Sequence, residues 1–511
     1  MTTLNRRADE FEYGRRDLYQ QLQAVYTYVQ AHMALLTPVR RLPRDIIQEI
    51  FIACLPEDRN CVMSALEAPV LLGQVCSSWR TISLSTPRLW ARLHIVEPLL
   101  PREPSVSKQL LHAEKHAQRI ETTKAWLARS GECPLSLSFS SESSQWGAEG
   151  VDAPNIFFQV LVLFARRWQD IRLVASPGAL MHLSCLREDD VPMLKSLDIR
   201  ELRPPTEFNA VTPWEYFGLL SCPKMSSFTI HGGFQVASLL PLPWESLTSL
   251  TIFGWGSSDR LNRHRALEIL RKSPRLRVAN LGITDEDGVS APAVGECDTA
   301  LELSDLHSLR IVCDPWIFID NRLFSHLNLP KLRNLRVDIR SPEAVPADIY
   351  LFPFLRASPQ LQNLEINFHR FSKRQLIDLF AALPSTIQEL RLLDSPDGSL
   401  GENTPEDHTL AALIPTPDRP LDECCPNLAV FDITYSVDVS DEALLRFITA
   451  RMAVQPAALR RVHIRFDRLR QLDICAKLQL FLDSGLEVAL EYNDDRPVDL
   501  SPWRGVEQDL V

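Results

Sequence analysis

The sequence predicts an α/β fold in which a small all-helical module is followed by an irregular repeat solenoid with a curved parallel sheet. Two observations predict this arrangement. Self-similar lines recur at a nearly constant interval through the second half of the chain, and two short amphipathic patterns lie between residues 41 and 95. With 45% apolar and 23% charged residues, the 511-residue chain has the composition of a folded protein.

The repeated line reads Pro-x-Leu, then an apolar residue three positions on and another two beyond, as in "LPKLRNLRV" (329–337) and "SPQLQNLEI" (358–366). Most intervals between the first apolar positions are 26 to 31 residues, with one of 22 and one of 41. A period near 29 is typical of leucine-rich repeats, in which each unit supplies one short strand and a return. One such unit cannot bury its apolar residues without stacked neighbours. The first apolar positions are Leu194, Met225, Leu247, Leu276, Leu306, Leu332, Leu361, Ile387, Leu428, Leu459 and Leu486.

The segments between these lines predict helical returns at 372–383 and at 440–452, where a serine precedes the apolar pattern. The long interval is attributed to an inserted loop at 396–426, rich in proline, glycine and acids at 396–420. We therefore expect a leucine-rich-repeat-like solenoid over 132–495 and a C-terminal tail over 496–511. An unrelated α/β domain with leucine-rich strands is the other interpretation.

Residues 41–95 predict two short helices with wide apolar faces. The first begins at Pro43, with Asp45 in its first turn, where a carboxylate suits the helix dipole. A second is expected to begin at Pro69 and to run as one helix through Ile82. A unit of about 50 residues is near the lower limit for burying its own core, so stripes this wide leave apolar surface for a partner.

The line "LPRDIIQEIF…LGQVCSSWRTISLSTPRLW", covering Leu42 to Leu93, resembles an F-box. The resemblance lies in a Leu-Pro start, an Ile-rich first helix, an L-x-x-V-C-x-x-W helix and a P-x-L-W ending. Residues 56–68 make the link between the helices longer than in short F-boxes. In this respect, and in the line "WLARSGECPLSLSF" (126–139), the chain is similar to members of expanded fungal F-box families.

The resemblance implies that the module docks on the Skp adaptor, and through it on the cullin, of a ubiquitin ligase, while the repeats capture a protein substrate. The alternative for each docking residue is a place in the internal core of the module. On this analogy the adaptor-binding residues are Leu42, Pro43, Ile46, Ile47, Ile50, Val75, Cys76 and Trp79.

Two further helices flank the module. Residues 1–40 carry Leu18, Leu22, Val25 and Val29 at helical spacing, which predicts a helix that either folds back on the module or forms a coiled-coil dimerisation arm. Residues 96–131 predict a linker helix between the module and the solenoid.

The sequence offers no case for catalysis, a cofactor or a metal. His112 and His116 are four residues apart but lack the H-E-x-x-H order of zinc hydrolases. A net charge of -11 disfavours nucleic acid, and the longest apolar run is about half of the roughly 20 residues that span a membrane. Eleven scattered cysteines and a charged N-terminal segment predict a soluble protein of the cytoplasm, the nucleus or both.

Side chains that alternate with the inward Leu and Ile residues should face the exposed side of the sheet, where such arrays usually bind partners. Their mixed charges suit a protein substrate; for most of them, the alternative is a solvated face without a ligand. A non-enzymatic substrate receptor is therefore the leading hypothesis, ahead of an F-box scaffold without ubiquitination and of an enzyme with a hidden site. The predicted substrate-binding residues are Arg336, Asp338, Glu365, Asn367, His369 and Arg391, within a wider set that includes Arg310, Asp432 and His463.

Overall fold

The structure, a computed structural model, divides the chain into two units that we describe separately. Unit 1 comprises residues 1–96 and 113–138, and unit 2 comprises residues 97–112 and 139–511. Within them the structure describes residues 15–16, 18–29, 42–98, 105–141, 156–202, 214–232, 240–254, 261–284, 300–313, 323–339, 351–367, 371–393, 407–416, 424–434, 439–454, 456–466 and 468–492.

Unit 1 is mainly helical. After a helix at 18–29, its elements are α2 (Arg44–Ala53), α3 (Leu72–Val75), α4 (Ser77–Leu84), the 3-10 helix η2 (Pro87–Trp90), β1 (Arg92–Val96), the C-terminal part of α5 (Val106–Arg129) and most of β2 (Leu135–Ser140). The expected all-helical module therefore ends in a strand. Leu93 and Ile95 alternate inward along β1, and the N–H of His94 donates to the carbonyl of Cys61 at 2.7 Å.

The expected second helix is interrupted. Cys76 adopts an extended conformation (φ −161°, ψ 170°) between α3 and α4, so the prediction of one continuous helix from Pro69 was wrong. The Sγ of Cys76 instead accepts from the N–H of Trp79 at 3.4 Å and caps α4. Arg80 Nε donates to the carbonyl of Gly73 at 2.8 Å, which ties the two short helices together.

Unit 2 alternates strands with helices or irregular returns. Its strands are β3 (Trp168–Ala175), β4 (Ser196–Glu201), β5 (Ser227–Gly232), β6 (Ser249–Gly254), β7 (Val278–Ile283), β8 (Leu301–Glu302), β9 (Ser308–Cys313), β10 (Leu327–Asn328), β11 (Asn334–Ile339), β12 (Asn363–Asn367), β13 (Glu389–Leu393), β14 (Val430–Thr434), β15 (Arg461–Arg465) and β16 (Glu487–Glu491). Its α-helices beyond α5 are α6 (Ile156–Val162), α7 (Pro177–Leu180), α8 (Arg263–Lys272), α9 (Leu351–Arg356), α10 (Lys373–Ala382), α11 (Asp407–Ala411), α12 (Asp441–Ala453) and α13 (Gln479–Asp483).

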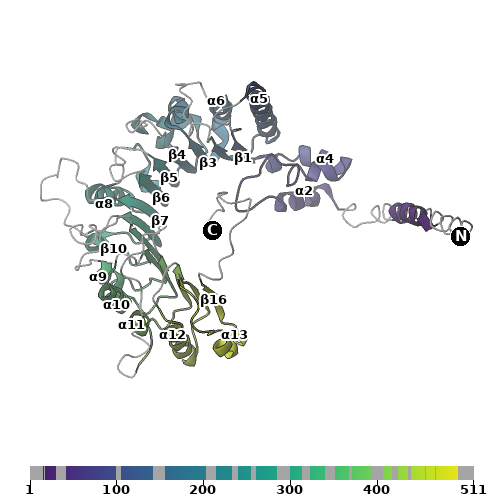
Figure 1. The fold of residues 1–511 in the computed structure, drawn as a ribbon. Helices are drawn as coiled ribbons and strands as arrows, with labels where there is room; N and C mark the ends of the chain where they lie inside the picture. The colour runs from purple at the N-terminus through teal and green to yellow at the C-terminus, as the bar shows by residue number, and fades with distance from the viewer. Residues whose placement is uncertain are drawn as a thin grey trace, which may run out of the picture. The chain divides into compact units, whose positions relative to one another are not determined.

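Short 3-10 helices join several of these elements: η4 (Ala165–Arg167), η5 (Met181–Cys185), η6 (Glu188–Asp190), η7 (Trp214–Tyr216), η8 (Gly218–Ser221), η10 (Trp244–Ser246), η12 (Phe324–His326) and η14 (Ala476–Leu478). In Figure 1, α8 to α12 lie on the outer side of the strands of unit 2.

In unit 2, one long sheet has the strand order β3-β4-β5-β6-β7-β9-β11-β12-β13-β14-β15-β16. From β3 to β16 every neighbouring pair is parallel. Sequence order and sheet order run together, as stacking of successive repeats requires. The mixed α/β character and the long parallel sheet are thus those of a repeat solenoid.

The repeat positions are buried as the period predicts. All eleven first apolar positions, from Leu194 to Leu486, are at most 4% exposed, and ten of their strands begin two residues later. The Pro-x-Leu signature is a turn: Leu361 N–H donates to the carbonyl of Ser358 at 3.2 Å, with Pro359 at the second turn position, where no donor is needed. The repeat period did not reveal β1, β2 and β3, which precede Leu194 in the chain.

The predicted helical returns are present as α10 and α12. Ser372 and Gln375 form a capping box, and Ser440 caps α12 through the N–H of Ala443 at 3.1 Å. The expected inserted loop at 396–426 needs a correction, because it contains α11, in which Leu410 is buried. A buried apolar side chain anchors this part of the insertion to the fold.

Candidate functional site

Helix α2 divides its apolar side chains between two faces. Ile47 and Phe51 are 7% and 0% exposed, and the Phe51 ring meets the edge of Trp79 with centroids 4.8 Å apart. Ile46 and Ile50, one helical turn apart, are 45% and 40% exposed. The helix therefore supports its own unit with one face and presents aliphatic surface with the other.

Helix α3 adds exposed aliphatic surface. Val75 is 58% exposed, and Leu71, four residues earlier in the sequence, is 42% exposed. We call Ile46, Ile50, Leu71 and Val75 the aliphatic group of unit 1. Leu71 was not among the predicted docking residues, although its i, i+4 relation to Val75 was readable from the sequence.

The structure separates the eight predicted docking residues by burial. Pro43, Ile46, Ile50 and Val75 are exposed, Leu42, Cys76 and Trp79 are half-buried, and Ile47 is buried. Cys76 caps α4 and Trp79 packs on Phe51, so both side chains stabilise unit 1 itself. Four of the eight are thus open to a partner.

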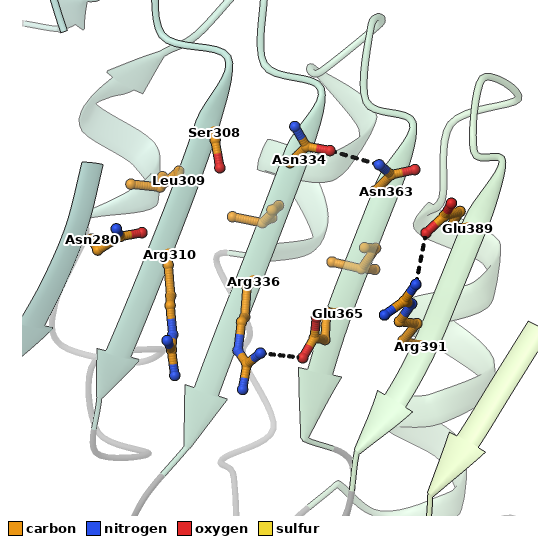
Figure 2. A pocket seen from close by; sticks show the side chains of 12 residues that line it. Asn280, Ser308, Leu309, Arg310, Asn334, Arg336, Asn363, Glu365, Glu389 and Arg391 are labelled. Carbon is orange, nitrogen blue, oxygen red and sulfur yellow. Dashed lines mark hydrogen bonds and ion pairs between the residues drawn. The ribbon is translucent and has the colours of Figure 1, made fainter. Parts of the chain in front are cut away.

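The exposed face of the sheet in unit 2 carries a row of polar side chains. Strand register places Asn280, Arg310, Arg336, Glu365, Arg391, Asp432 and His463 at equivalent positions on successive strands from β7 to β15. Figure 2 shows part of this row together with a second row at the start of the strands, which includes Ser308, Asn334, Asn363 and Glu389. Between β7 and β13, the two rows line a hollow of about 310 Å³.

Ion pairs connect the strands within this hollow. Arg310 donates to Asp338 Oδ2 through Nε at 2.8 Å and Nη2 at 2.6 Å, and Arg336 Nε donates to both Asp338 oxygens at 3.0 Å. Arg336 Nη1 also pairs with Glu365 Oε1 at 2.5 Å (Figure 2). Asp338 is only 6% exposed, so the two guanidinium groups cover it.

The charges of the face nearly balance. Burial raises the pKa of Glu365 above its usual value, and the neighbouring Arg336 opposes that shift. Glu389 and Arg391 form a looser pair at 3.3 Å, and Asn363 Nδ2 donates to Asn334 Oδ1 at 2.6 Å (Figure 2). Such a surface presents donors and acceptors of both charges, which favours a polar protein ligand over a phosphate backbone.

Of the six predicted substrate-binding residues, Arg336, Glu365 and Arg391 line the hollow. Asp338 supports two arginines from a buried position, Asn367 is buried with its Oδ1 unpartnered among the described residues, and His369 lies outside those residues. Asn280, Ser308, Asn334, Asn363 and Glu389 also line the hollow and were not predicted from the sequence. Alternation from the inward leucine of each strand assigns these positions to the same face.

In the part of the chain that the structure describes, no group of three or more His, Cys, Asp and Glu side chains is arranged to hold a metal ion. No described helix is both long and apolar enough to cross a membrane.

The fold defines a repeat protein with a long parallel sheet, and comparisons with known proteins add little to that class. No model of a known family and no curated protein matches the chain. Among solved structures it is similar to a chain of the Rad7–Elc1 complex from yeast, with 16% identity over 70% of this chain and 86% of that chain and a TM-score of 0.34. It is also similar to a Bacteroides fragilis protein, with 10% identity over 77% of this chain and 74% of that chain and a TM-score of 0.25. Neither similarity identifies a shared function.

Proposed function

We propose that the protein is the substrate-recognition subunit of a Skp–cullin–F-box ubiquitin ligase. The F-box resemblance covers Leu42 to Leu93, and the two faces of α2 carry the proposal. A helix whose Ile47 and Phe51 already serve the core has no internal use for Ile46 and Ile50 at 45% and 40% exposure. Exposed aliphatic residues at helical spacing suit a groove on another protein.

The proposed role of unit 2 is to hold a protein substrate on the exposed face of its sheet. Arg336, Glu365 and Arg391 present charges of both signs around the hollow. Asn334 and Asn363 share one hydrogen bond, and each amide has further capacity to donate and accept. In this proposal the protein is not an enzyme: it positions a substrate for transfer by its partners, in the cytoplasm, the nucleus or both.

The docking role is tested by capture of the full-length protein on immobilised Skp adaptor. Ile46→Glu combined with Ile50→Glu should abolish capture, because two carboxylates would be buried against an apolar surface. Leu66→Glu is the matched control, since Leu66 is an exposed aliphatic residue of the same unit outside the aliphatic group. Full capture of a folded double variant would exclude this docking mode.

The alternative is an F-box scaffold that binds the adaptor without promoting ubiquitination. The two roles differ in the fate of the proteins that the sheet face binds. If the protein is a substrate receptor, the partners bound by its sheet face should be degraded in cells that carry the parent protein. In cells that carry the Ile46→Glu, Ile50→Glu variant, the same partners should accumulate. Partners captured through the sheet face whose half-lives are the same with parent and variant would favour the scaffold.

A further inference from the structure

A hollow of about 480 Å³ lies wholly within unit 1 and is distinct from the aliphatic group and the sheet face. The long link at 56–68 supplies Met63 to one wall, Pro69 and Val70 directly after the link continue that wall, and the end of α4 supplies Leu84. The volume is in the range of roughly 300–1,000 Å³ that is usual for small-ligand sites.

Hydrogen bonds and burial hold the long link at 56–68 in place. Glu67 accepts from the backbone N–H of Val62 at 2.8 Å and from Arg59 Nη2 at 2.6 Å, while Cys61 is fully buried. Val62 also bridges to His94 of β1. The extra length between the helices therefore forms a defined side of the hollow.

Two almost fully buried tryptophans line the hollow. Trp90 and Trp126 are 3% and 1% exposed, and their rings meet edge to face with centroids 4.7 Å apart. Trp90 Nε1 donates to the carbonyl of Ser83 at 2.9 Å. Trp126 Nε1 is buried and has no acceptor among the described residues, so a hydrogen-bond donor beside the hollow is unused.

The charged side chains of the hollow are both cationic. Arg80 Nε donates a hydrogen bond to the carbonyl of Gly73, and the Arg129 guanidinium lies 4.8 Å from the centre of the Trp90 ring. Neither forms an ion pair with any described carboxylate, and no acidic side chain lines the hollow. Two arginines beside an apolar wall complement an anion that carries an apolar body.

We propose that this hollow binds a small apolar carboxylic acid. Its apolar body lies against Pro69, Val70 and the tryptophans, and its carboxylate accepts hydrogen bonds from Arg80 and Arg129. The lining residues include no member of the aliphatic group and none of the sheet face of unit 2, so the proposal does not depend on adaptor docking or on a substrate on the sheet.

Titration calorimetry of the full chain tests the charge requirement with two probes of similar shape, 1-naphthoate and the neutral 1-naphthalenemethanol. Naphthoate should bind at least about tenfold more tightly, because only its carboxylate engages the arginines. Equal affinity for the two probes, or no binding of naphthoate, would overturn the proposal. This comparison needs no variant.

Variants then locate the site. Arg80→Gln and Arg129→Gln should each weaken naphthoate binding about tenfold, whereas Arg88→Gln, which affects an exposed pair with Glu49 outside the hollow, should not. Gly73→Leu should abolish binding, since a Cβ there meets only Arg80 at 3.9 Å and the larger side chain can enter the hollow. With unfolding temperatures matched to the parent, unchanged binding in these hollow variants would place the probe elsewhere and refute the site.

Discussion

The two candidate binding surfaces are built on opposite physical principles. The aliphatic group of unit 1 consists of side chains that unit 1 does not need, because Ile47 and Phe51 already fill the inner face of α2. On the sheet of unit 2, Arg310 and Arg336 share the buried carboxylate of Asp338, and Arg336 also reaches Glu365. The first surface is apolar area that the core of unit 1 does not use, whereas charged side chains of the second surface already pair with one another.

This difference determines how each surface responds to substitution. Removing an exposed isoleucine should change association and leave folding nearly intact, because little buried area is lost. Removing a member of the arginine–carboxylate network should change both, since its partners are left with unmet charges. Stability measurements can therefore separate the two surfaces even before any partner is identified.

The largest expected effect comes from the inner face of α2. Phe51→Ala removes a fully buried ring and its edge-to-face contact with Trp79, so the free energy of unfolding of unit 1 should fall by about 3–5 kcal/mol. Calorimetry should show the loss in one transition and leave a second one in place. A loss below about 1 kcal/mol would mean that α2 does not support the core of its unit.

A buried carboxylate in unit 2 provides the next effect. Asp441, 1% exposed, accepts from Arg468 Nη2 at 2.6 Å, from the N–H groups of Gln471 and Leu472 at 2.8 and 2.7 Å, and from Tyr492 Oη at 3.0 Å. Asp441→Asn should cost about 3 kcal/mol in chemical denaturation, because Arg468 loses its carboxylate partner. Glu442→Gln, on the same first turn of α12, is the control.

The same carboxylate makes stability depend on acid. Burial alone would raise the pKa of Asp441, but the hydrogen bonds from Arg468, Leu472, Gln471 and Tyr492 hold that pKa below its usual value. Its contribution is complete above the unfolded-state pKa of about 3.9 and is lost as pH falls through the lower folded-state pKa. Asp441→Asn should therefore lose less stability than the parent on acidification below about pH 4; an identical acid profile would contradict this assignment.

A smaller effect is expected on the sheet face. Asp338→Asn should destabilise unit 2 by about 1–2 kcal/mol, a value reduced because both arginine partners are about one-third exposed. Glu389→Gln, which removes an exposed pair at 3.3 Å, should change stability by less than about 0.5 kcal/mol. Equal losses for the two variants, measured by denaturant unfolding, would remove the distinction between a buried and an exposed pair.

Local signals made the repeats of unit 2 predictable. The turn at Pro359 is closed by a hydrogen bond between residues only three apart, and the following strand needs no more than alternation to assign its faces. The pairing of Arg310 with Asp338 was not predictable in the same way. These residues are 28 positions apart, and only the register of β9 with β11 brings them together.

In unit 1, the angle between consecutive residues around α2 limited what the sequence could predict. Ile46 and Ile47 are separated by about 100° around the helix, so both fit a wide apolar stripe, and only the packing of α2 within unit 1 decides which one is buried. The break at Cys76 had no periodic signal either. It depends on a thiol that caps α4 and on Arg80 bonding back to Gly73.

The smallest stability effect should come from Ile50→Ala, and it is the sharpest test of the difference between the surfaces. Alanine is the better helix former and the side chain is 40% exposed, so the unfolding free energy should change by less than about 0.5 kcal/mol. Adaptor affinity should nevertheless fall about tenfold, as expected for an aliphatic anchor at an interface. Calorimetric unfolding and adaptor titration on the same sample measure both. A variant that lost stability in proportion to affinity would show that Ile50 belongs to the core, and the two faces of α2 would no longer be distinct.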